Sequence, residues 1–339
     1  MEAILQDLKT RYEDAKAANP KARIRDLATQ LETSEAQLAA LGASNVLLND
    51  DFKTLLLDAH TLGHVMALTR NDNAVHERKG VYNNISFEGP VGMALNEDID
   101  LRLFMMHWKY GFAVQEGERS SLQFFDKSGQ AVHKIYATEK TDMPAWEALV
   151  DKYKAAQRTT ELSVAPYPAC EPALPDAAID VAAFRQDWLE LKDTHEFFGL
   201  LRKYKLQRTQ ALRLAPEGHA VEVAADMARK MLIAAAERQV PIMVFVGSRG
   251  CIQIHTGNVN QVMPTGPWFN VIDPEFNLHL RETAIAQTFI VKKPSVDGIV
   301  TSIELFDANG EMIVQFFGKR KPGNPELESR RDLITSIAQ

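Results

Sequence analysis

The sequence contains an internal duplication, and this feature constrains the fold more than any other. Short segments of the first half recur in the same order in the second half. The matching pairs are Val65-Met66 with Ile242-Met243, Gly89-Pro90 with Gly266-Pro267, Asp100-Leu101-Arg102-Leu103 with Asn277-Leu278-His279-Leu280, and Phe125-Asp126 and Gly129 with Phe306-Asp307 and Gly310. The offset between matching positions is about 177 at the start and about 181 at the end. We therefore predict one structural unit present twice, with the extra residues inserted in a loop near Lys292–Asp297, because loops tolerate insertions.

Each copy begins with helices and continues with strands. Residues 1–42 place apolar side chains at helical spacing, with a break at Asn19-Pro20 and a stop at Gly42. From residue 43 onward, short apolar stretches alternate with turn residues, which predicts antiparallel strands joined by tight turns. Helix is expected again over residues 141–165 and 180–238, and strands follow. This order predicts two similar α+β halves, each with an antiparallel sheet that carries helices on one side.

A proline-rich stretch separates the two copies. The segment APYPACEPALPDAAID holds four prolines within about fifteen residues, a composition typical of linkers. The predicted organisation is therefore an N-terminal repeat at residues 1–165, a linker at residues 166–180 and a C-terminal repeat at residues 181–339.

Composition excludes several classes of protein. With 45% hydrophobic and 24% charged residues, the chain is typical of a globular protein. Its apolar runs fall far short of the ~20 residues that cross a bilayer, so no membrane insertion is expected. The net charge of −7 without a long basic run argues against nucleic-acid binding. Only Cys170 and Cys251 are present and the polar N-terminus lacks a secretory pattern, so we expect a reduced, cytoplasmic protein.

Familiar nucleotide-binding and hydrolase motifs are missing from the sequence. The segment GSRG at residues 247–250 lies between two apolar stretches, so it predicts a hairpin turn and not a phosphate loop. His60 and His64 have the spacing of two residues on one helical face, which would allow a metal pair, but zinc requires further ligands. The alternative is that they mark a helix end leading into a strand.

The segment from Phe184 to Ala215 is the most informative part of the chain. A stripe at helical spacing includes His195, which has no obvious acidic partner; its members are Phe184, Trp188, Leu191, His195 and Phe198. By itself this stripe favours a core histidine. Asp193 and Glu196 instead fit a capping box that would begin a helix at Thr194. A first-turn position favours the neutral imidazole that binds metals, and Gly199 would leave space for a flat ligand. The sequence leaves both alternatives open.

Cations and soft apolar side chains accompany His195. The cations of this half are Arg208, Lys292, Lys293 and Arg320, and the strand residues near them are Met243, Phe245, Phe316 and Phe317. In the first half, Arg102 and Phe104 share one face of a predicted strand. Each residue alone fits a solvated face or a core. Together they predict a site for a large, planar, apolar anion, held by a neutral histidine, several cations and aromatic or methionine walls.

Three segments carry a resemblance to a known family. DTHEFFGLLRKYKLQRTQALRLA, VFVGSRGCIQIHTGNV and FDANGEMIVQFFGKRKPG resemble the HemS/ChuS/HmuS/PhuS haemin-degrading and haem-trafficking proteins of Gram-negative bacteria. The resemblance extends over essentially the whole chain and agrees with its length and duplication. It implies two large twisted antiparallel β-sheets with helical triplets. It also implies a b-type haem in a cleft on the C-terminal half, reached by groups from the N-terminal half.

The resemblance further implies roles for individual residues. His195, in the DTH motif, corresponds to the axial iron ligand, and Arg102 corresponds to the distal arginine. Gln315 and Phe317 correspond to pocket positions, and Arg208, Lys293 and Arg320 correspond to the cations for the propionates, with Lys292 as a register alternative. Together with Phe104, Met243 and Phe245 from the strand pattern above, these are the predicted haem-binding residues. The stretch RKYKLQRTQ lacks the additional histidines of some trafficking members, which favours a single-ligand mode.

The implied function is cytoplasmic haem binding in haem-iron uptake. In the first alternative, dioxygen and an external reductant degrade haem oxidatively and iron is released. In the second, the protein is a carrier or store that delivers haem to a separate haem oxygenase without turnover. A third alternative is an α+β interaction protein with His195 in its core. Expected partners besides haem are a reductase or haem oxygenase and the haem importer, and the chain is expected to be a monomer or dimer.

Overall fold

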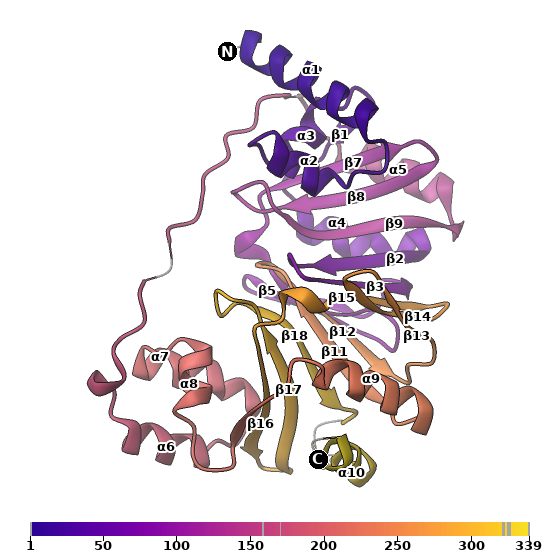
Figure 1. Ribbon diagram of the computed structural model, residues 1–339. Helices are drawn as coiled ribbons and strands as arrows, with labels where there is room; N and C mark the ends of the chain where they lie inside the picture. Colours follow the sequence, from indigo (N-terminus) through magenta and orange to yellow (C-terminus); the bar gives the residue numbers. More distant parts are fainter. Residues whose placement is uncertain (1, 158, 170, 321–322, 324–326, 338–339) are drawn as a thin grey trace. The chain divides into compact units, whose positions relative to one another are not determined.

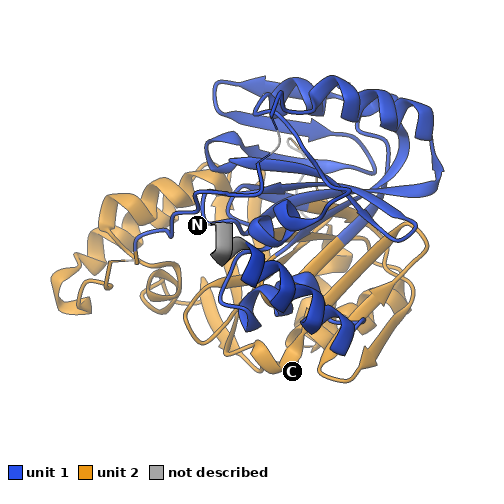
Figure 2. Cartoon of the chain, turned by 90° about the horizontal axis from the view of Figure 1, so that it is seen from above, with its two compact units in different colours: residues 1–70, 77–168, 248–253 blue, residues 71–76, 169–247, 254–339 orange. Residues whose placement is uncertain are grey.

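The structure is a computed structural model that describes residues 2–157, 159–169, 171–320, 323 and 327–337 of the 339-residue chain. The chain divides into two compact units, coloured separately in Figure 2. Unit 1 comprises residues 1–70, 77–168 and 248–253, and unit 2 comprises residues 71–76, 169–247 and 254–339. Each unit therefore includes one short segment from the other half of the chain.

Within the described residues, the same order of elements occurs twice: three helices, a strand, a helix, eight strands and a final helix. The first set is α1 (Glu2–Ala18), α2 (Ile24–Gln30), α3 (Glu35–Leu41), β1 (Val46–Leu47), α4 (Phe52–Asp58), β2 (Gly63–Arg70), β3 (Ala74–Gly80), β4 (Ile85–Glu88), β5 (Val91–Leu95), β6 (Asp100–Phe104), β7 (Tyr110–Glu116), β8 (Arg119–Phe125), β9 (Ala131–Thr141) and α5 (Met143–Tyr153). The second set is α6 (Val181–Leu189), α7 (Phe197–Tyr204), α8 (Arg208–Arg213), β10 (Ala220–Val223), α9 (Met227–Arg238), β11 (Ile242–Gly247), β12 (Cys251–Gly257), β13 (Val262–Thr265), β14 (Trp268–Ile272), β15 (Phe276–Arg281), β16 (Gln287–Ser295), β17 (Gly298–Phe306), β18 (Met312–Gly318) and α10 (Glu328–Ile337). The predicted duplication is confirmed.

The strands form two large antiparallel sheets of nine strands each, which confirms the predicted α+β class. Unit 1 contributes the run β1-β7-β8-β9-β2 and the run β4-β5-β6. Unit 2 contributes the equivalent runs β10-β16-β17-β18-β11 and β13-β14-β15. The two repeats thus share their strand order as well as their element order.

The first three helices of each set lie together. In Figure 1, α1, α2 and α3 group near β1 and β7, and α6, α7 and α8 group beside β16. Local sequence explains these helix ends. Ser34 begins α3 with a capping box, in which its hydroxyl accepts from the Gln37 N–H and the Gln37 carboxamide accepts from the Ser34 N–H, both at 3.2 Å. Gly42 caps the other end of α3, as predicted.

An aromatic cluster joins the second helical triplet to its sheet. Phe184 and Trp188 of α6 and Phe197 of α7 are buried with Phe289 of β16 and Phe306 of β17. The Trp188 and Phe197 rings meet edge to face, with centroids 4.8 Å apart. Burying each such side chain contributes about 2–3 kcal/mol, so this cluster holds α6 and the start of α7 firmly on the sheet.

The structure corrects three predictions about the elements. Strands β16 and β17 have nine residues each, against seven in β7 and β8, so the four extra residues lengthen a hairpin and do not form a loop. Strand β10 lies inside the stretch predicted to be helical, and α5 ends at Tyr153, well before residue 165. The GSRG turn does join β11 to β12, as predicted.

The proline-rich segment begins in contact with unit 1. The Tyr167 ring lies under two cations, with the Arg249 guanidinium 3.8 Å and the Lys127 ammonium 4.5 Å from its centroid. Further along, the described residues include a single 3-10 turn at Asp176–Ala178, and Cys170 lies outside the described residues. Among the helices that the structure describes, none is both long and apolar enough to cross a membrane.

Candidate functional site

His195 lies in a short turn at the start of α7. Thr194–Glu196 form a 3-10 helix, and α7 follows at Phe197. The predicted capping box is present: the Asp193 carboxylate accepts from the His195 N–H at 2.8 Å, and the Glu196 carboxylate accepts from the Asp193 N–H at 3.2 Å. Because α6 ends at Leu189, the apolar stripe does not lie on one unbroken helix.

The imidazole of His195 is exposed and has a carboxylate partner. Its Nδ1 lies 2.6 Å from Oδ1 of Asp193, and its side chain is 82% exposed. Because a carboxylate only accepts, Nδ1 carries the proton and Nε2 keeps a lone pair that a metal can use. His195 is therefore not a core histidine. Its acidic partner, Asp193, precedes it by two residues, a spacing that does not belong to the i, i+3 and i, i+4 pattern of a helix face.

Asp193 is held ionised by its surroundings. The N–H of His195, its imidazole and the positive charge of Arg320 keep the pKa of the Asp193 carboxyl below its usual value. A carboxylate on Nδ1 fixes the tautomer and the ring orientation of an imidazole that ligates a metal. The turn is thus arranged so that Nε2 is a good ligand for a metal.

The surface next to His195 is open. Phe198 is 57% exposed, and a Cβ placed on Gly199 would meet no atom within 4 Å. The predicted apolar stripe is therefore divided, since Phe184 and Trp188 are fully buried while His195 and Phe198 face solvent. A flat ligand on this side would meet both a nitrogen donor and an aromatic ring.

Strands β11 and β18 place four predicted residues on one face. Met243 lies opposite Phe317, and Phe245 lies opposite Gln315. All four are half-buried, whereas their neighbours along the strands are buried. The Phe245 and Phe317 rings meet with centroids 4.9 Å apart and planes at 60°. Because alternate strand residues share a face, these side chains form a continuous apolar patch that includes one amide.

Arg208 and Lys293 meet at a buried carboxylate that sequence analysis did not single out. Glu304 of β17 is fully buried. It accepts from Nε and Nη2 of Arg208 at 2.8 and 2.9 Å, from Lys293 Nζ at 2.7 Å and from Ser302 Oγ at 2.9 Å. Lys293 is 3% exposed, and Lys292, the register alternative, is exposed. Both predicted cations are therefore bound to Glu304. The available signal was a lone charged residue inside the strand segment GIVTSIELF.

Burial and charge pairing act in opposite directions on this cluster. Burial lowers the pKa of Lys293 to about 8, although Glu304 opposes the shift. Burial would raise the pKa of Glu304, but the charges of Arg208 and Lys293 hold it well below its usual value. At neutral pH the cluster therefore carries two positive charges and one negative charge.

Arg320 completes the predicted residues of unit 2. It follows β18, is half-buried, and lies near enough to Asp193 for its charge to act on that carboxylate. Unit 2 contains eight of the predicted residues: His195, Arg208, Met243, Phe245, Lys293, Gln315, Phe317 and Arg320.

The other two predicted residues, Arg102 and Phe104, belong to β6 in unit 1. Both are half-buried on one face of the strand, and Arg102 lies opposite Met93 of β5. The Arg102 guanidinium donates to the Asp100 carboxylate and, at 3.2 Å, to the Leu101 carbonyl. Burial raises the pKa of Asp100, while Arg102 opposes this shift. The direction of the Arg102 side chain is therefore set by local partners.

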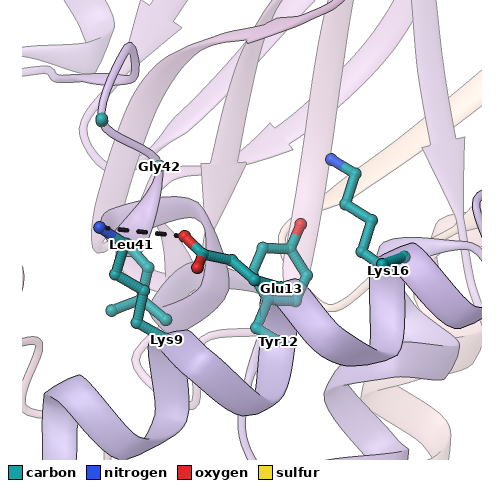
Figure 3. A pocket seen from close by; sticks show the side chains of 8 residues that line it. Lys9, Tyr12, Glu13, Lys16, Leu41 and Gly42 are labelled. Carbon is teal, nitrogen blue, oxygen red and sulfur yellow. Dashed lines mark ion pairs between the residues drawn. The ribbon is translucent and has the colours of Figure 1, made fainter.

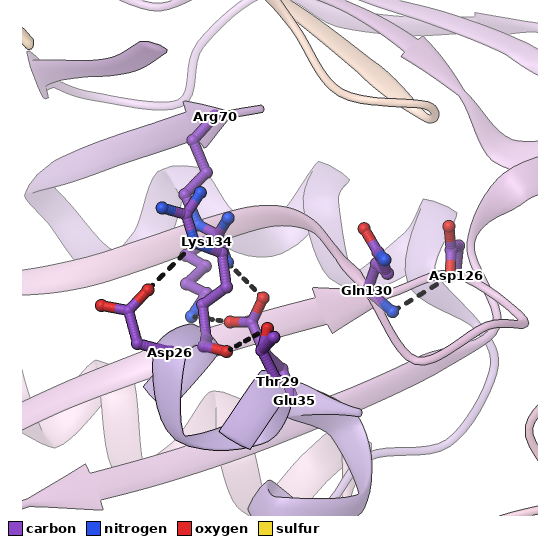
Figure 4. Close-up of polar contacts among 8 residues, drawn as sticks. Asp26, Thr29, Glu35, Arg70, Asp126, Gln130 and Lys134 are labelled. Atoms are coloured by element: carbon purple, nitrogen blue, oxygen red, sulfur yellow. Dashed lines mark hydrogen bonds and ion pairs between the residues drawn. The ribbon is translucent and has the colours of Figure 1, made fainter. Parts of the chain in front are cut away.

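Unit 1 also holds a buried charge cluster, shown in Figure 4, but here the carboxylate comes from a helix and the two cations come from strands. Glu35, the first residue of α3, pairs with Arg70 of β2 and with Lys134 of β9, whose Nζ is 3.4 Å from Oε2. Burial opposes ionisation of Glu35, but the two cations keep its pKa below the usual value. In unit 1 the helix supplies the carboxylate, whereas in unit 2 Arg208, the first residue of α8, supplies a cation.

Unit 1 lacks a counterpart of the histidine. The helices α2 and α7 are each followed by a residue in the left-handed conformation, Glu32 with φ of 54° and Lys205 with φ of 53°. Aligning these two residues places Ala22 opposite His195. The turn that carries His195 thus has a histidine in the second repeat and an alanine at the aligned position of the first.

The predicted alternative of a metal pair at His60 and His64 is not supported. His60 lies in the 3-10 helix Ala59–Leu62, and His64 lies in β2, so they do not share a helical face. The other alternative, a helix end before a strand, is correct. Across the described part of the chain, no group of three or more His, Cys, Asp or Glu side chains could hold a metal ion.

Figure 3 shows a surface groove of unit 1 with a volume of about 350 Å³. Side chains of α1 and residues 41–43 line it, including Tyr12 and Lys16. Lys9 and Glu13 pair across one turn of α1 at 3.9 Å. None of the predicted site residues lines this groove.

Comparisons with known sequences place the chain in a family. The model described as "Haemin-degrading HemS.ChuX domain" matches residues 31–153 and residues 205–336. The chain is 42% identical to the "Hemin transport protein HemS" of Yersinia enterocolitica in an alignment of 336 residues that covers 96% of this chain and 96% of that protein.

Solved structures with the same fold extend this result. Apo-PhuS, a heme-binding protein from Pseudomonas aeruginosa, has a TM-score of 0.95 and 48% identity, covering 97% of this chain and 98% of that chain. The heme degrading enzyme ChuS of Escherichia coli O157:H7 has a TM-score of 0.92 and 35% identity, covering 99% and 100%. The first stretch runs from before α3 to the end of α5, and the second runs from before α8 into α10, so the domain model matches the equivalent part of each set of elements. The chain therefore belongs to the HemS/ChuX family of haemin-degrading domains.

Proposed function

We propose that this protein binds haem in the cytoplasm through Nε2 of His195 and degrades it oxidatively during haem-iron uptake. The observation that carries the proposal is the exposed imidazole, oriented by Asp193 at 2.6 Å and next to the exposed ring of Phe198. A carboxylate on the second ring nitrogen is the usual support of a metal-ligating histidine. PhuS and ChuS are described as a heme-binding protein and a heme degrading enzyme.

Unit 2 supplies further groups that suit a haem. Met243, Phe245 and Phe317 offer an apolar patch for a porphyrin face. Arg320 is a cation near the turn of residues 193–196, which would carry the axial ligand and is called the ligand turn below. The cluster of Arg208 and Lys293 with one carboxylate keeps a net positive charge, which attracts the haem propionates.

The resemblance assigns the distal side to Arg102, and Phe104, on the same face of β6, offers a neighbouring apolar wall. The Asp100 carboxylate fixes the direction of the Arg102 guanidinium, so its donors are positioned before haem arrives. Bound haem supplies the ring-opening chemistry when dioxygen and an external electron donor are present. We further propose a reductase and the haem importer as partners, acting on a monomer or dimer.

A haem carrier is the second candidate. It is favoured by how the relatives are described: the "Hemin transport protein HemS" shares 42% identity and the heme-binding protein PhuS shares 48%, whereas the degrading enzyme ChuS shares 35%. In this case the same site delivers haem to a separate haem oxygenase without turnover.

One experiment separates these alternatives. Haemin is titrated into the protein while the Soret band is followed, and ascorbate or a reductase system is then added under air. Bleaching of the bound haem supports degradation, and a stable reduced spectrum supports the carrier. Absence of any Soret shift would sink both.

Two variants test the ligand. His195→Ala is expected to weaken haemin binding or change the spin state of the iron, because it removes the axial nitrogen. His219→Ala is the matched control, since His219 Nδ1 already bonds the Glu217 carbonyl at 3.1 Å. A wild-type spectrum in His195→Ala shows that the assignment is wrong.

Another pair of variants tests the distal arginine. Arg102→Ala is expected to bind haemin but to slow its turnover. Arg78→Ala is the control, because Arg78 is also a strand arginine paired with an aspartate, Asp98. Equal bleaching rates in Arg102→Ala and wild type count against the distal role.

A further inference from the structure

We propose that Glu304 is a positioning residue for His195, acting through Arg208, Lys293 and the ring of Phe197. The inference rests on the proposed function, in which His195 is the axial ligand. Glu304 would not touch the haem. Its effect would reach the iron through the turn that carries the imidazole.

The first link is the rigidity of the carboxylate itself. Glu304 is fully buried, and its oxygens accept four hydrogen bonds from Arg208, Lys293 and Ser302. Arg208 uses two nitrogens, a forked geometry that fixes the guanidinium plane. Oε1 accepts from Arg208, Lys293 and Ser302, and Oε2 accepts from Arg208, so the carboxylate is held in one orientation and links both cations.

The second link joins these cations to the ligand turn. The Phe197 ring has the Lys293 ammonium 4.6 Å and the Arg208 guanidinium 5.1 Å from its centroid. On another side it meets the Trp188 ring at 4.8 Å. Phe197 is 1% exposed, so cation–π attraction acts on it away from water, where it is strongest. Phe197 directly follows the 3-10 turn of His195, and a shift of its ring tilts that turn.

The lengthened hairpin supports the same turn from its other end. The Trp188 indole N–H donates to the Lys292 carbonyl at 3.1 Å, and the Val296 N–H donates to the Lys192 carbonyl at 2.9 Å. Both hydrogen bonds join the segment before His195 to the hairpin, the first to β16 itself and the second to the turn between β16 and β17. With Phe197 held by the Glu304 cluster, the turn is fixed on both sides.

The first repeat provides an internal comparison. Glu304 stands two residues before the end of β17, and Gln123 stands two residues before the end of β8. Each also lies opposite a residue at the same place of the next strand, Gln315 and Lys134 respectively. The repeat that lacks the histidine therefore has an amide where the repeat with the histidine has a carboxylate.

The test compares two buried carboxylates, each paired with two cations. Glu304→Gln keeps the size of the side chain but removes its charge. Glu35→Gln does the same in unit 1, where the carboxylate pairs with Arg70 and Lys134. Both variants are loaded with haemin well below their melting temperatures, and affinity and the iron–imidazole spectrum are measured.

We expect Glu304→Gln to bind haemin about tenfold more weakly, as is typical when support of a metal ligand is lost, with a spectrum shifted toward that of His195→Ala. Glu35→Gln should keep the wild-type affinity and spectrum. A wild-type spectrum in Glu304→Gln overturns the inference. So does an equal shift in Glu35→Gln, or tighter binding in Glu304→Gln, which would mean that the carboxylate only competes with propionates for the cations.

If Glu304→Gln does not fold, Ser302→Ala takes its place, because it loosens the carboxylate without leaving a buried charge unpaired. Its control is Ser121→Ala, which removes the equivalent contact to Gln123 at 3.0 Å. A spectral shift in Ser302→Ala alone supports the inference, and identical spectra overturn it. Failure of wild type to bind haemin, or a wild-type spectrum in His195→Ala, would instead refute the proposed function.

Discussion

The Nδ1 atom of His195 lies 2.6 Å from Oδ1 of Asp193, and the same carboxylate oxygen accepts the backbone N–H of His195 at 2.8 Å. One aspartate therefore begins the helical turn and orients the imidazole in it. The contacts that form the turn are therefore also the contacts that leave Nε2 free to face a ligand. The DTH sequence contains both functions within three residues.

Asp193→Asn should separate these two functions. Asn caps helices about as well as Asp, so the turn should persist, but the neutral amide supports the imidazole less. Haemin affinity is expected to fall about tenfold, measured by Soret titration. Asp180→Asn, at the start of α6, is the matched control, because Asp180 caps through the Ala183 N–H at 3.0 Å and has no histidine partner. Equal affinities for Asp193→Asn and wild type contradict the prediction.

Phe198→Ala should weaken haem binding without unfolding the protein. Phe198 is 57% exposed, so its truncation should change the free energy of unfolding by less than about 0.5 kcal/mol. Loss of an aromatic contact to the porphyrin is expected to cost about 0.5–1.5 kcal/mol of binding. Phe197→Ala provides the contrast, because this buried ring should cost about 3–5 kcal/mol of stability. Unchanged haemin affinity in Phe198→Ala would remove this ring from the site.

Acid should destabilise unit 1 through His133. This histidine is buried, hydrogen-bonds Tyr82 at 2.6 Å and Thr69 at 2.8 Å, and has its pKa lowered by burial to about 3 from 6.5. Between these values the unfolded chain binds a proton that the folded chain does not. Stability is therefore full above pH 6.5 and falls as the pH drops toward 3, by at most about 1.4 kcal/mol per pH unit.

The check is denaturant unfolding at pH 7 and pH 5. The wild type should lose stability over this interval, and His133→Gln should lose distinctly less. His60→Gln serves as a control, since His60 is exposed. An identical pH dependence in wild type and His133→Gln argues against a neutral buried imidazole.

Lys293 should produce a dependence of the same sign in a higher pH range. Its pKa in the folded protein is about 8, below the ordinary 10.5, because of burial. Between these values the folded chain has released a proton that the unfolded chain keeps, so stability should rise with pH by up to about 1.4 kcal/mol per unit. The difference in unfolding free energy between wild type and Lys293→Met, followed from pH 8 to pH 10, isolates this contribution. A flat difference would show that Lys293 titrates normally.

Many local features of this fold could be predicted because they depend on neighbouring residues. The capping box of Asp193 and Glu196 and the GSRG turn involve contacts within a few positions. The alternation of β11, with Met243 and Phe245 on the half-buried face, follows from strand geometry. The repeat was also readable, since matching segments such as those around Arg102 and His279 kept their order.

Other features depend on partners distant in the chain. Arg208 meets Glu304 across 96 positions of sequence, and no local pattern pairs them. Sequence alone does not decide whether Lys292 or Lys293 faces the interior, because this depends on how β16 pairs with its neighbour. Pairing with β17 turns Lys293 inward and Lys292 outward. The four extra residues could have formed a loop, but cross-strand hydrogen bonds extended β16 and β17 instead.

The sequence by itself thus determined that one unit occurs twice and that the second copy carries a histidine after a capping aspartate. Only the tertiary structure decided that this histidine is exposed, and that two of its accompanying cations are bound to a buried carboxylate. The physical reason is that capping and strand alternation are short-range, whereas burial and charge pairing arise when distant segments pack together.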